Sequence, residues 1–254
     1  MKTLRLLIIL PCLLFLGGKN AFAEITSDEA LSVFVSAGMA YKEGRYDAAI
    51  DKYNAILEGS RASGPLYYNL GNSYFKKGNV GRAVLNYERA KKYIPRDSDL
   101  KFNERYARSK IDQQTADTGQ SYFERVIQSQ IDFYTTEEII MILFGLGLSI
   151  GFLYLVSLYA NWRSSTRGWI MATLVFGILV YGFILITKVE YERGLAIVMA
   201  ETNTFFEPRP DSTVHFQLSE GMKTRILKSE GNWVKIERFD GKAGWIDREV
   251  LEKI

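Results

Sequence analysis

The chain has 254 residues, and its 32 basic and 29 acidic side chains give a formal net charge of +3. Three of the basic residues, Lys2, Arg5 and Lys19, lie within the first 23 positions, so the rest of the chain carries no net charge. A balanced charge gives no support to a nucleic-acid partner, and the single cysteine, Cys12, excludes an internal disulfide and a cysteine-ligated metal site.

The N-terminal segment has the pattern of a secretory signal. Lys2 and Arg5 precede an apolar run over residues 6–16, and residues 21–23 (Ala-Phe-Ala) place small side chains where a signal peptidase needs them. We therefore expect residues 1–23 to be a signal peptide that is cleaved after Ala23. The alternative is an uncleaved signal anchor, and in both cases the residues that follow are exported.

Residues 28–111 repeat at an interval of 34 positions. Three pairs of identical residues show this offset: Gly44 and Gly78, Ala49 and Ala83, Tyr53 and Tyr87. Self-similarity at this length predicts stacked helical hairpins. In the second copy Gly71 is small where two helices cross, Gly78 allows a turn and Pro95 ends the second helix. The pattern resembles the tetratricopeptide repeat (TPR), which implies an all-α superhelix of two and a half repeats.

The TPR resemblance also implies a concave groove lined by the first helix of each hairpin. Carried over by position, the groove residues are Phe34, Tyr68, Asn69, Asn72, Phe75, Lys76 and Asn103. Asparagine side chains can pair with peptide amides, and aromatic rings supply apolar contact. The alternative for Tyr68 and Phe75 is ordinary packing between repeats. A carboxylate clamp is not expected, because Phe34, Gly38 and Asp99 stand where it would need basic side chains.

Residues 112–137 connect the repeats to the apolar part of the chain. Positions 112–120 are polar and aperiodic, which indicates a linker. Between Tyr122 and Phe133, apolar residues recur at roughly helical spacing, so we expect an amphipathic juxtamembrane helix on the membrane surface. The alternative is a helix that packs on the repeat module.

Two stretches, 139–160 and 168–187, contain no Asp, Glu, Lys or Arg, and each is long enough to cross the hydrocarbon core as a helix. The loop between them, 161–167, carries Arg163 and Arg167 and no acid, so the positive-inside rule places it in the cytoplasm. Both flanking regions then lie on the opposite side of the membrane.

The two spans resemble an anchor more than a transport path. Neither contains a charged residue or a histidine, which argues against a proton relay or an ion pathway. Gly147 and Gly151 form a Gly-x-x-x-Gly step, which lets helix backbones approach closely. We expect this step to pack against the second span near Gly177, or against a span of another protein.

Residues 191–254 change to a strand pattern. The predicted strands are 195–200, 223–227, 233–238 and 244–246, with an irregular excursion through Pro208 and Pro210 after the first. The order of strands and Gly turns, with Asn232-Trp233-Val234 and Gly244-Trp245-Ile246, resembles a bacterial SH3 domain, an all-β barrel.

SH3-like barrels bind extended peptides on aromatic surfaces. The residues implied for such a surface here are Phe205, Phe206, Trp233 and Trp245, and the alternative for each tryptophan is burial in the core. The only histidine, His215, lacks the second His or Cys that a zinc site requires, and we expect it on the surface.

The order of segments predicts a multidomain membrane protein: a TPR superhelix, a two-helix transmembrane hairpin and an SH3-like barrel. This architecture resembles the BatE family of bacterial aerotolerance (Bat) systems. The resemblance implies an inner-membrane protein with both modules in the periplasm, and von Willebrand A-domain membrane proteins and a MoxR-type ATPase as neighbours.

The function expected from the sequence is that of a scaffold for protein partners. The alternative is a sensor or tether that binds peptidoglycan peptides through the barrel. An enzyme is not expected, because no nucleophile–base pair, phosphate loop or metal cluster is recognisable in the sequence. No cofactor is expected either.

Overall fold

The computed structural model describes residues 27–59, 62–111, 131–159 and 164–254. The predicted signal peptide and most of the predicted linker and juxtamembrane helix, 112–130, lie outside these residues. So does part of the loop between the two spans.

Five helices form the N-terminal module: α1 (Ser27–Lys42), α2 (Tyr46–Glu58), α3 (Gly64–Lys76), α4 (Val80–Tyr93) and α5 (Ser98–Arg108). Helix α1 pairs with α2, α3 pairs with α4, and α5 packs against α4 and α3. Each of the two pairs is joined by a turn whose glycine, Gly44 or Gly78, has a positive φ. These glycines stand 34 positions apart, as the sequence period predicts.

Side-chain caps define where the later helices begin. Ser63, Asn79 and Asp97 accept hydrogen bonds from the backbone N–H groups of Leu66, Arg82 and Leu100, respectively. Within the second pair, Gly71 of α3 lies against the ring of Tyr87, where an added Cβ would come within 2.7 Å of ring carbons. A small residue is therefore needed at this crossing.

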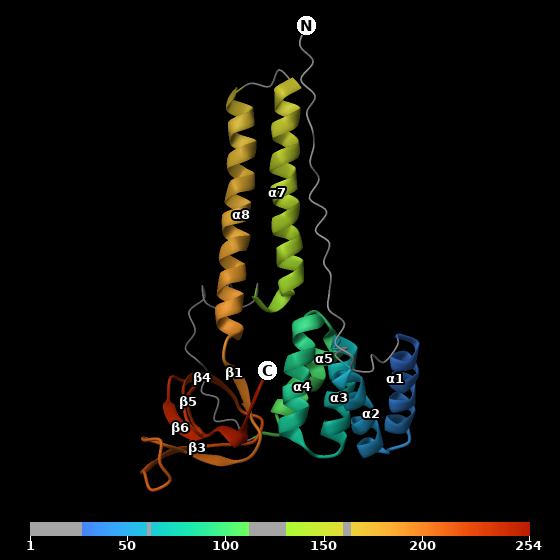
Figure 1. Cartoon of the computed structure of the whole chain (residues 1–254), viewed down its shortest axis with the longest axis vertical. Helices are drawn as coiled ribbons and strands as arrows, with labels where there is room; N and C mark the ends of the chain where they lie inside the picture. The colour runs from blue at the N-terminus through green and yellow to red at the C-terminus, as the bar shows by residue number, and fades with distance from the viewer. Residues whose placement is uncertain (1–26, 60–61, 112–130, 160–163) are drawn as a thin grey trace.

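Helices α7 (Thr136–Tyr159) and α8 (Ser164–Glu192) form an antiparallel hairpin that projects away from the rest of the molecule (Figure 1). Both are long and apolar enough to cross a membrane, over Thr136–Ser157 and Ser165–Glu192. Helix α8 extends beyond the predicted span at both ends, because loss of apolar character ends a span but does not end a helix.

The glycine step of α7 does not face α8. A Cβ added at Gly147 or Gly151 would meet no atom within 4 Å, whereas one at Gly177 would lie 3.4 Å from Leu146 Cδ1. The expected packing of Gly147 and Gly151 on the second span is thus not found. Packing on a helix of another protein stays a prediction.

The C-terminal module is a seven-stranded antiparallel sheet with strand order β3-β2-β6-β5-β4-β1-β7. The strands are β1 (Leu195–Val198), β2 (Thr202–Phe205), β3 (Val214–Leu218), β4 (Lys223–Glu230), β5 (Trp233–Arg238), β6 (Ala243–Asp247) and β7 (Leu251–Lys253). A short 3-10 helix, η1 (Arg248–Val250), precedes β7. The residues that alternate inward on β5 and β6, among them Val234, Ile236 and Ile246, are buried in its core.

The region expected to be irregular after β1 is a β-hairpin. Strands β2 and β3 pair with each other, and Pro208 and Pro210 lie in the turn between them. The prolines indicated a loop correctly, but the alternation in Thr202–Phe205 was too short to predict a strand. The pairing with β6 on the other side of β2 stabilises it in the folded sheet.

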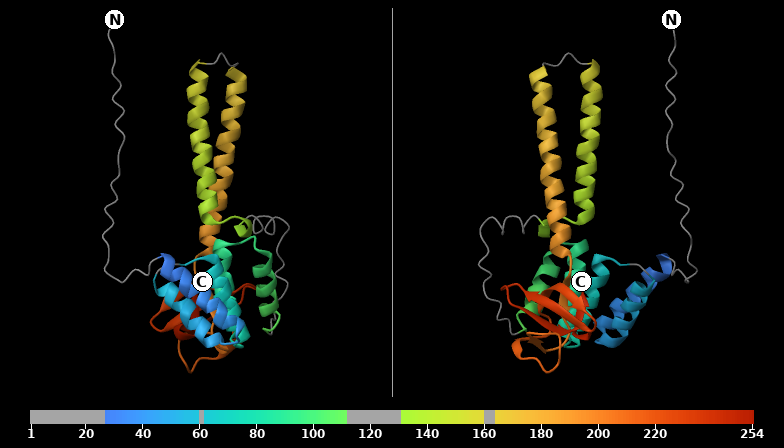
Figure 2. Two further views of the ribbon diagram at one scale, coloured as in Figure 1. Left: turned by 90° about the vertical axis from the view of Figure 1, so that its right-hand side faces the viewer. Right: turned by 60° about the vertical axis from the view of Figure 1, so that its left-hand side comes forward.

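The helical module and the barrel lie side by side at the same end of the hairpin (Figures 1 and 2), and α4 contacts β1. A membrane crossed by α7 and α8 would consequently have both modules on one side.

Candidate functional site

A cavity of about 200 Å³ lies on the helical module between α1, α3, α4 and α5. Four of the predicted groove residues line it: Asn72, Phe75, Lys76 and Asn103. The other lining residues are Tyr41, Tyr87, Phe102 and Tyr106. The cavity thus combines two amides and one cation with five aromatic rings.

The floor of this cavity is a network of hydrogen bonds around Asn72. Its Oδ1 accepts from the Tyr87 hydroxyl at 2.8 Å and from Asn103 Nδ2 at 2.9 Å, and Asn103 Nδ2 also lies 2.9 Å from the Tyr68 hydroxyl. Burial raises the pKa of Tyr87, so its hydroxyl stays protonated and donates. Among the described residues, nothing accepts from the amide N–H₂ of Asn72, which is left to donate to a carbonyl oxygen.

The rim of the cavity is aromatic. Tyr106 packs edge-to-face on Phe75 with ring centroids 5.5 Å apart, and stacks on Phe102 at 6.5 Å. Phe102 is 65% exposed. Exposed rings beside a polar floor suit an extended peptide that offers apolar side chains outward and amides inward.

Three predicted groove residues lie elsewhere. Phe34 packs edge-to-face on Tyr53 at 5.6 Å, and Asn69 is half-buried outside the cavity, with its backbone oxygen accepting from Ser73. Tyr68 does not line the cavity, but its hydroxyl accepts a hydrogen bond from Asn103 Nδ2. Sequence reasoning missed four lining residues: Tyr41, Tyr87, Phe102 and Tyr106. For Phe102 and Tyr106, their spacing of four on one helix was the available signal.

The predicted aromatic surface of the barrel divides into two groups. Phe205 lies edge-to-face on Trp233 at 5.7 Å, and it pairs in register with Trp245, which is only 8% exposed. Phe206 lies apart: it is exposed and stacks on His215 at 4.1 Å. His215 is on the surface as expected, and its Nδ1 lies 3.0 Å from the Ala243 carbonyl oxygen.

A second polar cluster lies where the modules meet. Glu88 of α4 is 6% exposed and forms ion pairs with Lys223 of β4, at 3.0 Å, and with Arg108 of α5. Arg108 also pairs with Glu104 at 2.8 Å. One buried carboxylate therefore joins the groove helix α5 to the barrel.

The electrostatics of Glu88 follow from these neighbours. Burial by itself raises the pKa of a carboxyl, but the attraction of Lys223 and Arg108 outweighs it and lowers the pKa of Glu88 below its ordinary value. Glu88 is accordingly ionised at neutral pH, and the two cations beside it are compensated.

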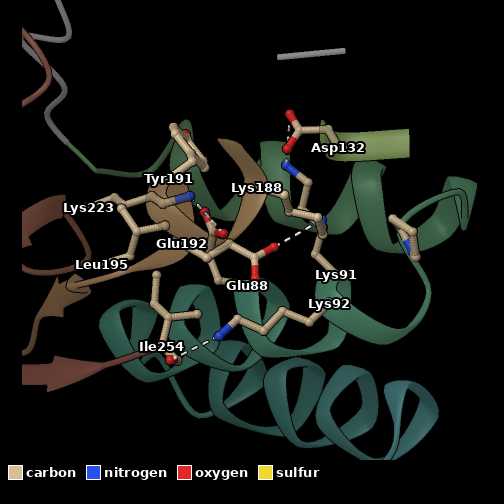
Figure 3. Close-up of a pocket in the computed structure, with 11 residues that line it drawn as sticks. Glu88, Lys91, Lys92, Asp132, Lys188, Tyr191, Glu192, Leu195, Lys223 and Ile254 are labelled. Atoms are coloured by element: carbon tan, nitrogen blue, oxygen red, sulfur yellow. Dashed lines mark hydrogen bonds and ion pairs between the residues drawn. The ribbon is translucent and has the colours of Figure 1, made fainter. Parts of the chain in front are cut away.

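Further contacts extend this junction to the barrel edge and to the hairpin (Figure 3). Lys92 Nζ donates to the Ile254 backbone oxygen at 3.1 Å. Glu220 Oε1 accepts from the Gly81 amide at 2.7 Å, which places a negative charge at the N-terminal end of α4. Lys188 Nζ of α8 donates to the Ile131 oxygen at 2.8 Å, and Lys91 Nζ of α4 lies 3.6 Å from the next residue, Asp132. The junction therefore joins all three parts of the chain.

Residues 198–253 match the family model of the bacterial SH3 domain. The matched region runs from the end of β1 to the end of β7, so the barrel is a bacterial SH3 domain. Such domains bind proteins or peptidoglycan. A comparison of the chain with curated proteins found no match.

Proposed function

We propose that the protein is a membrane-anchored scaffold that binds protein partners and catalyses no reaction. The carrying observation is the junction around Glu88, which holds the helical module and a bacterial SH3 domain against each other at one end of an apolar hairpin. Because the two binding surfaces are held at a fixed spacing, both can bind the same partner complex.

The helical module is, in this proposal, a TPR domain whose groove is the cavity around Asn72. The turn glycines Gly44 and Gly78 and the paired helices support it. The occupant is an extended segment of a partner protein. Its backbone carbonyl would accept from Asn72, its apolar side chains would contact Phe102 and Tyr106, and an acidic group would pair with Lys76.

A second weak contact at the barrel then raises the overall affinity. Once one site is occupied, the other binds at an effective concentration set by the fixed spacing of the modules. By resemblance to the BatE family, the partners would be von Willebrand A-domain membrane proteins of a Bat-type complex. The modules would lie in the periplasm, with the anchor in the inner membrane.

The scaffold proposal is tested by crosslinking and detergent pull-down from the native host. Phe102→Ala removes an exposed ring from the cavity rim and should lower recovery of the partner about ten-fold, the size expected for an aromatic anchor. The matched control is Tyr93→Ala, which removes an exposed ring of α4 that does not line the cavity. Equal recovery with both variants would contradict the proposed groove.

The same assay distinguishes the predicted roles of Asn72 and Asn69. Asn72 lines the cavity and Asn69 does not, so only Asn72→Ala should reduce recovery. Because Asn72 accepts from Tyr87, the helical content of this variant has to be compared with that of the wild type by circular dichroism.

A second candidate function is a tether to the cell wall. The match to the bacterial SH3 domain favours it, together with the adjacent rings of Phe205 and Trp233. If the barrel holds peptidoglycan stem peptides, the full chain in detergent will sediment with purified sacculi and Trp233→Ala will not. A wild-type protein that stays in the supernatant would remove this function.

A further inference from the structure

A larger cleft, of about 500 Å³, lies on the opposite side of α5 from the groove residues Phe102 and Tyr106, between α4, α5 and the residues before α7. Its charged lining consists of four basic residues and two acidic ones: Lys91, Lys101, Arg105, Arg108, Glu104 and Asp132. The cleft belongs to neither of the surfaces assigned to protein partners.

The charges in this cleft do not balance. Arg108 is held by Glu88 and Glu104, and Lys91 lies 3.6 Å from Asp132. Lys101 and Arg105 form no ion pair within the described part of the chain, although both are exposed. They stand four positions apart on α5 and so project from the same face, about 6 Å from each other along the axis.

The cleft also lies beside the start of the first candidate span. Phe133, which lines it and is 46% exposed, precedes by three residues the point where the first candidate span begins. Arg96, two residues before α5, donates to the Phe133 oxygen at 3.1 Å and pairs with Glu138 in the first turn of α7 at 2.5 Å.

Distances along α5 compare well with the thickness of a lipid headgroup layer. Lys101 lies about 4.5 Å along the helix axis from the start of α5, and Arg105 lies about 10 Å from the same point. The headgroup layer on each side of the hydrocarbon is roughly 5–8 Å thick. With the flexible length of their side chains, both cations reach a phosphate in that layer.

We propose that this cleft binds the phosphate headgroup of an anionic phospholipid. A phosphodiester accepts from the Lys101 ammonium and from two N–H groups of the Arg105 guanidinium, which pair well with phosphate oxygens. Phe133 contacts the glycerol end of the acyl chains, which continue beside α7 into the membrane. The bound lipid fixes the depth of the helical module at the bilayer surface.

Native mass spectrometry of the full chain from nanodiscs tests the proposal. The nanodiscs contain equal amounts of phosphatidylglycerol and phosphatidylcholine, and the readout is the lipid that stays bound after release. We expect selective retention of phosphatidylglycerol, lowered roughly five-fold by each of Lys101→Ala and Arg105→Ala. The double variant Lys42→Ala/Lys242→Ala removes two exposed cations outside the cleft and should retain the lipid like the wild type.

Four results would overturn the proposal. Equal retention of the two lipids would show that the cleft does not recognise an anion. Undiminished retention by Lys101→Ala/Arg105→Ala would place the lipid elsewhere. Displacement of phosphatidylglycerol by an equal concentration of inorganic phosphate would assign the cleft to a soluble anion. A chain that does not enter the nanodiscs would refute the spanning hairpin, and the lipid site with it.

Discussion

Replacing Glu88 by glutamine tests whether the junction holds the barrel against the helices. The change removes the only negative charge that Lys223 contacts in the described residues, and the Lys223 side chain is only 15% exposed. Breaking a buried pair from one side costs ~3–5 kcal/mol. We expect the lower end, ~3 kcal/mol, because Arg108 keeps Glu104 and Lys223 keeps the Tyr191 ring at 5.7 Å.

Amide hydrogen exchange measures this loss at the junction itself. The Gly81 amide donates to Glu220 across the interface, so its protection reports docking of the barrel. A loss of ~3 kcal/mol corresponds to exchange that is roughly 150-fold faster. Amides inside α2, far from the barrel, should exchange as in the wild type.

The matched control for this prediction is Glu252→Gln. It breaks the pair between Arg89 and Glu252, which joins the same two modules at 3.0 Å, but the Glu252 side chain is 41% exposed. An exposed pair contributes at most about 1 kcal/mol, or roughly a five-fold change in exchange. If Glu88→Gln increases the exchange rate of the Gly81 amide no more than the control does, the buried carboxylate is not what joins the modules.

Three further predictions concern pH, packing and orientation. Because the folded-state pKa of Glu88 is lowered from 4.5 to about 2, its contribution is fully present above pH 4.5 and is lost as the pH falls through that interval. The difference in thermal midpoint between wild type and Glu88→Gln should therefore shrink from pH 6 to pH 3, and a constant difference would contradict this. Gly71→Ala drives a Cβ into the Tyr87 ring and should cost ~1–3 kcal/mol in thermal unfolding, whereas Gly145→Ala, which meets no atom within 4 Å, should cost none. Alkaline phosphatase fused at Ile254 should be active and the same fusion at Ser165 inactive; the reverse pattern would place both modules in the cytoplasm.

Much of the architecture was predictable because its signals are local. A stretch of about 20 uncharged residues is sufficient to indicate a span, and a 34-residue period with turn glycines at Gly44 and Gly78 is sufficient to indicate helical hairpins. The strand Trp233–Arg238 was predicted with its observed bounds, because it alternates between Gly-containing turns. Each of these signals depends only on neighbours along the chain.

The candidate site was predicted less completely. Asn72 and Asn103 were expected in the groove and meet there, but Tyr41, Tyr87, Phe102 and Tyr106 were not expected. A repeat period identifies equivalent positions on successive helices without giving their superhelical twist, and the twist decides which side chains converge. The pairing of β2 with β6 was likewise beyond reach, because it joins residues 40 positions apart.

By itself, then, the amino-acid order determined where the helices, the spans and most strands form, since hydrophobic period and turn residues act over a few positions. Only the tertiary structure decided that Glu88, Arg108 and Lys223 share one buried site, and that Lys101 and Arg105 form no ion pair with any described residue in a cleft beside the start of the first candidate span. Single charged residues carry no periodic signal. Their partners are chosen by the docking of the modules, which brings together residues as distant in the chain as Glu88 and Lys223, 135 positions apart.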